Sequence, residues 1–195
     1  MKSRRVFRTI GLVVVGGILV LAAPRRALAQ QARLPRAKAP RTLLGFESPD
    51  AAGSWTGARC RVTAIHVSEG RSALSIHYPM RQGTSDAPVA ATIAWANGHG
   101  YAVKDWSHYG KAAFDAWVDG PEPLTITVEL RGAPGRKAFA KELDVQPGRK
   151  NSFELTLNDA ADAIALNDVR SIAFSGNRLT RDATMTLDNF RLLPG

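Results

Sequence analysis

The chain has 195 residues, with 26 Lys and Arg against 17 Asp and Glu, and a formal net charge of +9. Six of the cations lie in residues 1–29 and four in residues 30–41, where there is no acid, so residues 42–195 carry −1. A nearly neutral domain lacks the basic stripe that nucleic acid requires, and the composition argues against that partner. Cys60 is the only cysteine, so no intramolecular disulfide can form.

Residues 1–29 have the pattern of an export signal. A basic start precedes an apolar run, and Ala27-Leu28-Ala29 is a small-x-small cleavage signal before Gln30. The run is short and contains several glycines, so no stable membrane span is expected after processing. Ser3-Arg4-Arg5-Val6-Phe7 resembles the twin-arginine motif, which implies export of a folded protein. An ordinary secretion signal is the alternative, and both routes predict a periplasmic or secreted protein.

The remainder divides into a linker and one domain. Residues 30–42, with Pro35 and Pro40 between basic residues, predict a solvated linker, and residues 43–195 are enough for one domain with a core. Short alternating segments recur between Gly, Pro, Asn and Asp, and the one plausible helical turn is at 158–163. The predicted strands are 43–47, 59–67, 72–78, 89–95, 111–119, 124–131, 138–145, 151–157, 169–175 and 183–193. This pattern predicts an all-β antiparallel sandwich.

The strand at 111–119 predicts a face open to a ligand. Its even positions are apolar, whereas Asp115, Trp117 and Asp119 alternate with them and face the other way. An indole between carboxylates can stack on a sugar ring and accept hydrogen bonds from its hydroxyls. Trp117 is therefore the candidate stacking platform, although it could also simply cover an edge or pack under a loop. The candidate polar contacts are Asp115, His77, Glu129 and Arg131.

Several short motifs, taken in order, resemble the galactose-binding-like jelly rolls. They are Phe46-Glu47, Glu69-Gly70-Arg71-Ser72-Ala73-Leu74, Asp105-Trp106-Ser107, Phe114-Asp115, Phe153-Glu154-Leu155 and Thr186-Leu187-Asp188-Asn189-Phe190-Arg191-Leu192. The resemblance covers 44–193, and the family includes many carbohydrate-binding modules attached to polysaccharide-degrading enzymes. It implies a jelly-roll β-sandwich whose partner is an oligosaccharide or a polysaccharide. One fold hosts many functions, so the ligand is less well specified than the fold.

The same resemblance implies a structural calcium ion. In that family an acid of the first strand and an acid of the last strand converge on Ca²⁺, and the matching positions here are Glu47 and Asp188. Two carboxylates brought close together need a cation or a proton. Asp188 also interrupts the apolar alternation of its strand, as a bulged or metal-bound residue does. The alternative is that Asp188 caps a surface bulge and Glu47 pairs with an arginine such as Arg191.

The sequence gives little support to catalysis. The four histidines lack metal-binding spacing, there is no Gly-x-Ser-x-Gly motif, and Cys60 alternates like a strand residue of the core. Asp115, Asp119 and Glu129 could share a face as glycosidase carboxylates, but no second domain is expected to form a cleft. The sequence therefore favours a non-catalytic, exported glycan-binding protein. The alternatives are a periplasmic protein-interaction or assembly domain and, with less support, a polysaccharide-active enzyme.

Overall fold

The computed structural model describes residues 39–80, 88–95, 100–177 and 179–195. The predicted export signal and residues 30–38 of the predicted linker lie outside the described residues. The described chain forms two sheets in which every strand pairing is antiparallel. The predicted antiparallel β-sandwich is therefore confirmed. None of its helices is long and apolar enough to cross a membrane.

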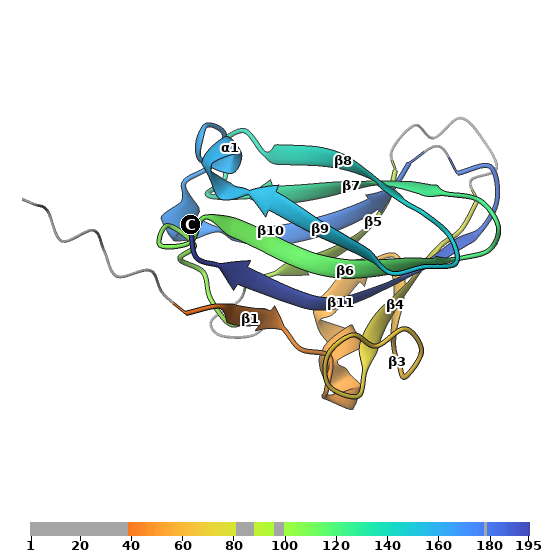
Figure 1. The fold of residues 1–195 in the computed structure, drawn as a ribbon. Helices are drawn as coiled ribbons and strands as arrows, with labels where there is room; N and C mark the ends of the chain where they lie inside the picture. Colours follow the sequence, from red (N-terminus) through yellow and green to blue (C-terminus); the bar gives the residue numbers. More distant parts are fainter. Residues whose placement is uncertain (1–38, 81–87, 96–99, 178) are drawn as a thin grey trace, which may run out of the picture. The chain divides into compact units, whose positions relative to one another are not determined.

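The first sheet has six strands: five in the order β3-β4-β11-β6-β9, and β1, which pairs with the C-terminal part of β11 (Figure 1). Its strands are β1 Arg41–Leu44, β3 Arg59–Thr63, β4 Ala73–Tyr78, β6 Lys111–Asp119, β9 Asn151–Thr156 and β11 Ala183–Leu193. The long β11 holds this sheet together, since it pairs with β1, β4 and β6.

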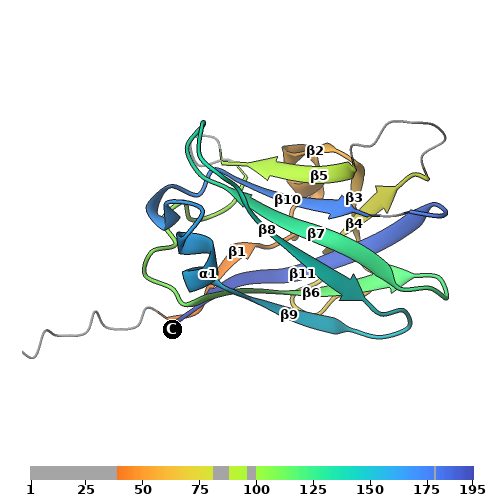
Figure 2. The ribbon, with the colours of Figure 1, turned by 90° about the horizontal axis from the view of Figure 1, so that it is seen from above.

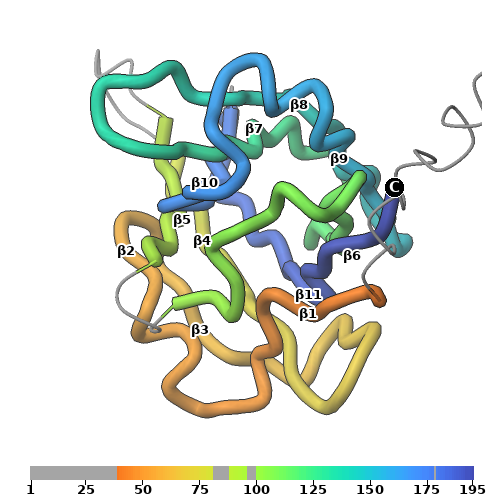
Figure 3. Tube along the Cα trace, turned by 90° about the vertical axis from the view of Figure 1, so that its left-hand side faces the viewer, coloured from red at the N-terminus to blue at the C-terminus, as the bar shows by residue number. Residues whose placement is uncertain are grey.

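The second sheet has five strands in the order β2-β5-β10-β7-β8, and Figure 2 shows β5, β10, β7 and β8 side by side. They are β2 Trp55–Gly57, β5 Val89–Ala94, β7 Leu124–Arg131, β8 Phe139–Val145 and β10 Ser171–Gly176. Figure 3 shows the two sheets as separate layers. The helices of the described residues are short: η1 Pro49–Ser54, α1 Leu157–Ala161 and η2 Leu166–Asp168.

Most predicted strands match the observed ones to within one or two residues, with three larger differences. The three-residue β2 was not predicted, and β1 spans Arg41–Leu44 rather than residues 43–47, so Glu47 follows the strand instead of lying in it. The strand predicted for 59–67 ends at Thr63, because His66 (φ 58°) and Gly70 (φ 74°) adopt left-handed backbone conformations that a strand cannot contain. Residues 64–72 instead form a loop between β3 and β4, called the β3–β4 loop below.

The core between the sheets is aromatic at its centre. Phe114 of β6 lies with its ring centroid 5.4 Å from that of Phe174, on the other sheet, and 5.7 Å from that of Phe190 on β11. Trp106, in the turn that precedes β6, is fully buried, and its indole N–H donates to the Val103 carbonyl oxygen at 2.8 Å. The alternation predicted for β6 is confirmed on this side, since its even positions are all buried.

A bulge in β11 changes which residues of that strand face the core. Asp188 pairs with Asp115, but Arg191 pairs with Ala113, so β11 contains one residue more than β6 between these pairs. Before the bulge Leu187 is buried in the core, and after it Phe190 is, so the buried parity switches from odd to even. Of the two interpretations of Asp188, bulged or metal-bound, the structure supports a bulge that begins directly after it, and Asn189 within the bulge has φ 53°.

Candidate functional site

The six-stranded sheet turns a polar surface away from the core, called the outer face below. Strand register aligns its side chains in two rows that each cross four strands. One row is Arg61, Ser75, Thr186 and Trp117, in which Ser75 and Thr186 are buried. The other is Arg59, His77, Thr184 and Asp119, none of which is buried. Neighbouring strands lie about 4.8 Å apart, so three strand spacings separate the backbones of Arg61 and Trp117 by roughly 14 Å. A ligand that touches both ends of a row must be longer than one sugar ring.

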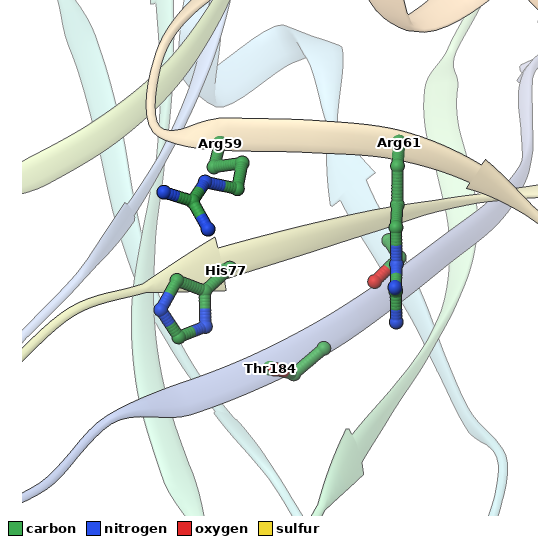
Figure 4. Close-up of a pocket in the computed structure, with 5 residues that line it drawn as sticks. Arg59, Arg61, His77 and Thr184 are labelled. Carbon is green, nitrogen blue, oxygen red and sulfur yellow. The ribbon is translucent and has the colours of Figure 1, made fainter.

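A pocket of about 180 Å³ lies at the β3 side of this face. Its lining residues are Arg59, Arg61, Ser75, His77 and Thr184. Figure 4 shows the Arg59 side chain extending from β3 toward His77 on β4, and the Arg61 side chain crossing β4 toward β11, the strand that carries Thr184. Sites for drug-sized ligands usually measure roughly 300–1,000 Å³, so this pocket holds one part of a ligand whose remainder lies along the sheet.

Trp117 lies on the outer face, half-buried, with His66 of the β3–β4 loop against it. The two rings stack at 5.5 Å between centroids with 13° between their planes. His66 Nε2 also lies 3.3 Å from an Asp119 carboxylate oxygen, which fixes the imidazole over the indole. Sequence analysis predicted the position of Trp117 on this face, but not that a loop residue covers part of its ring.

The structure places His77 at the pocket, but it buries Asp115, the other predicted polar contact on this sheet. His77 lines the pocket, and its Nε2 lies 3.7 Å from a carboxylate oxygen of Asp182 at the margin. Asp115 is only 2% exposed, which contradicts the prediction of an open ligand contact. Its carboxylate accepts hydrogen bonds from Ser152 Oγ at 2.6 Å and Asn189 Nδ2 at 3.2 Å, so its oxygens are occupied within the protein.

The environment of Asp115 keeps it ionised. Burial by itself would raise the pKa of this carboxyl, but hydrogen bonds from Ser152, Ser68 and Asn189 and the charge of Lys150 together lower it. An ionised, buried carboxylate is unsuited to act as a general acid on a glycosidic bond. Burial also raises the pKa of Cys60 to about 11, so this thiol is poorly activated as a nucleophile.

Glu129 and Arg131 were predicted to contact the same ligand, and that grouping is wrong. Both belong to β7 in the five-stranded sheet, where Val128 and Leu130 face the core and the alternate residues face away from it. The two side chains form an ion pair with each other. For the same reason Glu129 cannot share a face with Asp115, so the carboxylate set considered for a glycosidase does not assemble.

The two predicted metal ligands lie on either side of one cavity. Glu47, Asp188 and Asn189 are among the residues that line this space of about 180 Å³. Glu47 Oε1 accepts the backbone N–H groups of Arg71 and Ser72, at 2.9 and 3.2 Å. Gly70 has φ 74°, which favours glycine, and a Cβ there would lie 2.2 Å from the same oxygen and displace the Glu47 side chain.

Asp188, only 2% exposed, holds the other end of this loop. Its Oδ2 accepts from the backbone N–H of Ser68 at 2.6 Å, from Ser68 Oγ at 3.0 Å and from the Glu69 N–H at 2.9 Å. Arg191 donates to the Asn189 carbonyl oxygen at 3.0 Å, and no ion pair between it and Glu47 is found among the described residues. Both carboxylates therefore anchor the β3–β4 loop.

The donor set of this cavity suits a hard cation. Asn189 Oδ1 is buried and has no hydrogen-bond partner among the described residues. It adds an amide oxygen to the carboxylates of Glu47 and Asp188, and all three are ligand types that Ca²⁺ accepts. No group of three or more His, Cys, Asp or Glu side chains in the described ranges is arranged to hold a metal, so a cation here would also rely on amide and backbone oxygens.

Sequence analysis missed Arg59, Arg61 and His66. The alternation Arg59-Cys60-Arg61 indicates that both arginine side chains project from the same side of a strand, the side that faces away from the core. It does not indicate that β3 pairs with β4, which is what brings them beside His77. The position of His66 over Trp117 depends on a left-handed backbone in the β3–β4 loop, for which the sequence carries no comparable signal.

No family model and no curated protein sequence matches the chain. Among solved structures, an exo-β-agarase matches with a TM-score of 0.62 at 16% identity, over 80% of this chain and 25% of that one. The agarase AgWH50C matches with a TM-score of 0.59 at 17% identity, over 81% of this chain and 25% of that one. The chain thus spans about a quarter of the length of these two enzymes.

Two smaller proteins match over nearly their whole length. A family 11 carbohydrate-binding module from Clostridium thermocellum, solved with a β-1,3-1,4-mixed-linked tetrasaccharide, has a TM-score of 0.56 at 15% identity, over 80% of this chain and 96% of that one. The same family's module from the cellulosomal cellulase Lic26A-Cel5E has a TM-score of 0.59 at 13% identity, over 82% of this chain and 96% of that one. The chain has the jelly-roll β-sandwich fold of carbohydrate-binding modules.

Proposed function

We propose that the protein is a non-catalytic, exported glycan-binding protein that holds an oligosaccharide or a stretch of polysaccharide on the outer face. The observation that carries this proposal is the accessible row Arg59, His77 and Thr184, which runs from the pocket to Asp119, beside Trp117 on β6. It offers hydroxyl and cationic donors at one end and an aromatic ring at the other, the combination with which proteins bind sugars. The fold shared with carbohydrate-binding modules supports this proposal. Export rests on the signal-like residues 1–29.

The charged neighbours of Trp117 support binding rather than catalysis. Asp115 is engaged by hydrogen bonds, and Asp119 lies 3.3 Å from His66 Nε2. Glycosidases require two carboxyl groups that flank the scissile bond, one of them with a raised pKa. The outer face provides no such pair among the described residues, so the proposed role is to retain the glycan and not to cleave it.

We expect Trp117→Ala to weaken glycan binding about fivefold or more. Stacking on an aromatic ring is worth about 1 kcal/mol or more, and the substitution also removes the support of His66. A glycan array followed by isothermal titration of the bound sugar measures the change. Trp95→Ala is the matched control, because Trp95 is also half-buried but follows β5 in the other sheet. Equal losses for both variants would contradict a site at Trp117.

A protein-interaction surface is the competing function, and the exposed side chains do not favour it. A protein-binding face usually presents a broad apolar patch. Within the described ranges the large exposed apolar residues are Ile65 and Met80. A partner protein that co-purifies with the chain, together with no bound glycan on the array, would establish the competing function instead.

We propose in addition that Glu47, Asp188 and Asn189 hold a structural Ca²⁺. The ion would neutralise the two carboxylates and tie the β3–β4 loop to β11, without a chemical role. An ion that binds the folded state alone adds RT ln(1 + [L]/Kd) to the free energy of unfolding, about 2.7 kcal/mol at a hundredfold excess over Kd.

We expect calcium to raise the melting temperature of the wild type and a chelator to reverse the rise. Glu47→Gln removes one ligand charge but retains an oxygen that accepts from Arg71 and Ser72, so it should remove most of the calcium response without unfolding the loop. Glu154→Gln on β9 is the matched control, because Glu154 pairs with Lys111 away from this cavity. A wild type that melts at the same temperature with calcium and with chelator would overturn the calcium site.

A further inference from the structure

The pocket on the outer face has a positive charge that nothing within it balances. Arg59 and Arg61 are two residues apart on β3, so both side chains leave the same side of the strand, and both are exposed. No Asp or Glu lines the pocket. Among the described residues, neither guanidinium lies within ion-pair distance of a carboxylate.

The nearest acids are at the margin and have other partners. Asp182 lies 3.7 Å from His77 Nε2 and accepts the Met80 N–H at 2.7 Å, and Asp119 is held by His66. Residues 42–195 as a whole carry −1, so the paired arginines are a local feature and not a consequence of a basic domain. Charge and geometry together point to a ligand that brings its own negative charge to this pocket.

We infer that the glycan bound on the outer face is acidic and that its carboxylate or sulfate group binds between Arg59 and Arg61. This inference rests on the proposed glycan-binding function. A guanidinium donates two parallel hydrogen bonds to a planar or tetrahedral oxyanion, and such charge-assisted bonds are stronger and more selective than those to a sugar hydroxyl. Ser75, His77 and Thr184 lie within reach of the sugar that carries the anion.

The alignment of side chains across the strands sets the direction in which the bound glycan runs. From Arg59 the accessible row runs across His77 and Thr184 to Asp119, roughly 14 Å away by strand spacing, and Trp117 lies two residues from Asp119 on the same face of β6. A glycan whose acidic sugar occupies the pocket therefore places a later sugar of the same chain against the indole. This arrangement recognises an acidic oligosaccharide in two places, by charge at one end and by stacking at the other.

Matched sugars test the charge directly. The full chain is titrated with oligogalacturonate, with the fully methyl-esterified oligomer of the same length, with a sulfated galactan oligosaccharide and with its neutral counterpart. We expect the charged member of at least one pair to bind roughly tenfold to a hundredfold more tightly than its neutral partner, as charge-assisted hydrogen bonds predict. Whether the carboxylate pair or the sulfate pair shows the difference identifies the anion.

Variants locate the charge on the protein. The double variant R59Q/R61Q should reduce affinity for the acidic sugar to that for the neutral one, and R59K/R61K should recover part of it, because lysine keeps the charge but not the paired hydrogen bonds. Arg131→Gln is the matched control, since Arg131 is exposed on the other sheet and pairs with Glu129. Melting temperatures show that every variant is folded.

The outcomes separate this inference from the proposed function. Equal binding of acidic and neutral sugars leaves glycan binding intact and overturns the acidic ligand. No binding of any glycan overturns both. A single-stranded DNA of similar charge that binds as tightly as the acidic sugar would show a general polyanion site and would also overturn the inference.

Discussion

Phe114→Ala should lower the free energy of unfolding by about 3–5 kcal/mol, the range for deletion of a fully buried aromatic ring. Phe114 is fully buried, and its ring meets Phe174 of the opposite sheet as well as Phe190 and Phe153 of its own. The cavity would open where the two layers meet, so neither sheet can close it alone. Chemical denaturation measures the loss, and the melting temperature should fall by roughly 6–20 °C for a domain of this size.

Phe153→Ala provides the control for this substitution. Phe153 is the cross-strand partner of Phe114 on β9 but is only partly buried, so the same deletion should cost clearly less. Equal losses at the two positions, or a loss below about 1.5 kcal/mol for Phe114→Ala, would contradict a core centred on this ring.

Asp188→Ala should lower the free energy of unfolding by about 2–3 kcal/mol even with a chelator present. The substitution leaves the partly buried backbone N–H groups of Ser68 and Glu69 without their acceptor, and an orphaned buried donor costs about 1–3 kcal/mol. Removal of a negative charge directly across from Asp115 offsets part of that cost. Urea denaturation in the presence of chelator measures the loss without any contribution from a metal ion.

The control for Asp188→Ala is the same substitution at an exposed acid whose side chain forms no hydrogen bond or ion pair among the described residues. Asp162→Ala, at the exposed end of α1, should change the free energy of unfolding by less than about 0.5 kcal/mol. Asp188→Asn keeps one acceptor oxygen and should lie between the two alanine variants. If Asp188→Ala costs no more than Asp162→Ala, the carboxylate does not anchor the loop.

Alternation in the sequence predicted strands well but could not assign them to sheets. The bounds of β6, β7 and β11 agree with the prediction, because β6 and β7 alternate clearly over eight or more residues and β11 alternates on either side of its bulge. Alternation specifies which residues of a strand face the core, but not which sheet the strand joins. Glu129 was therefore placed correctly away from the core but on the wrong face of the sandwich relative to Trp117.

The local sequence pattern also could not predict that part of the outer face is buried. Asp115 has the parity of an exposed residue, and it is buried because Ser152, Asn189 and the β3–β4 loop close over it. That loop depends on contacts between Ser68 and Asp188, which are 120 residues apart in sequence. The metal positions Glu47 and Asp188 came from resemblance and remain a prediction, although both do line one cavity.

The β3–β4 loop contacts two neighbouring places on the outer face, Asp188 of β11 and Trp117 of β6, which lie two register positions apart. Ser68, bonded to Asp188, is only two residues from His66, which lies on Trp117. Release of Ser68 removes one of the contacts that position His66, which Asp119 also holds. Linkage is reciprocal, so if the proposed cation favours the closed loop, a ligand that also favours it must strengthen cation binding by the same factor by which the cation strengthens binding of that ligand. Affinities measured at one of these places would then depend on the occupancy of the other.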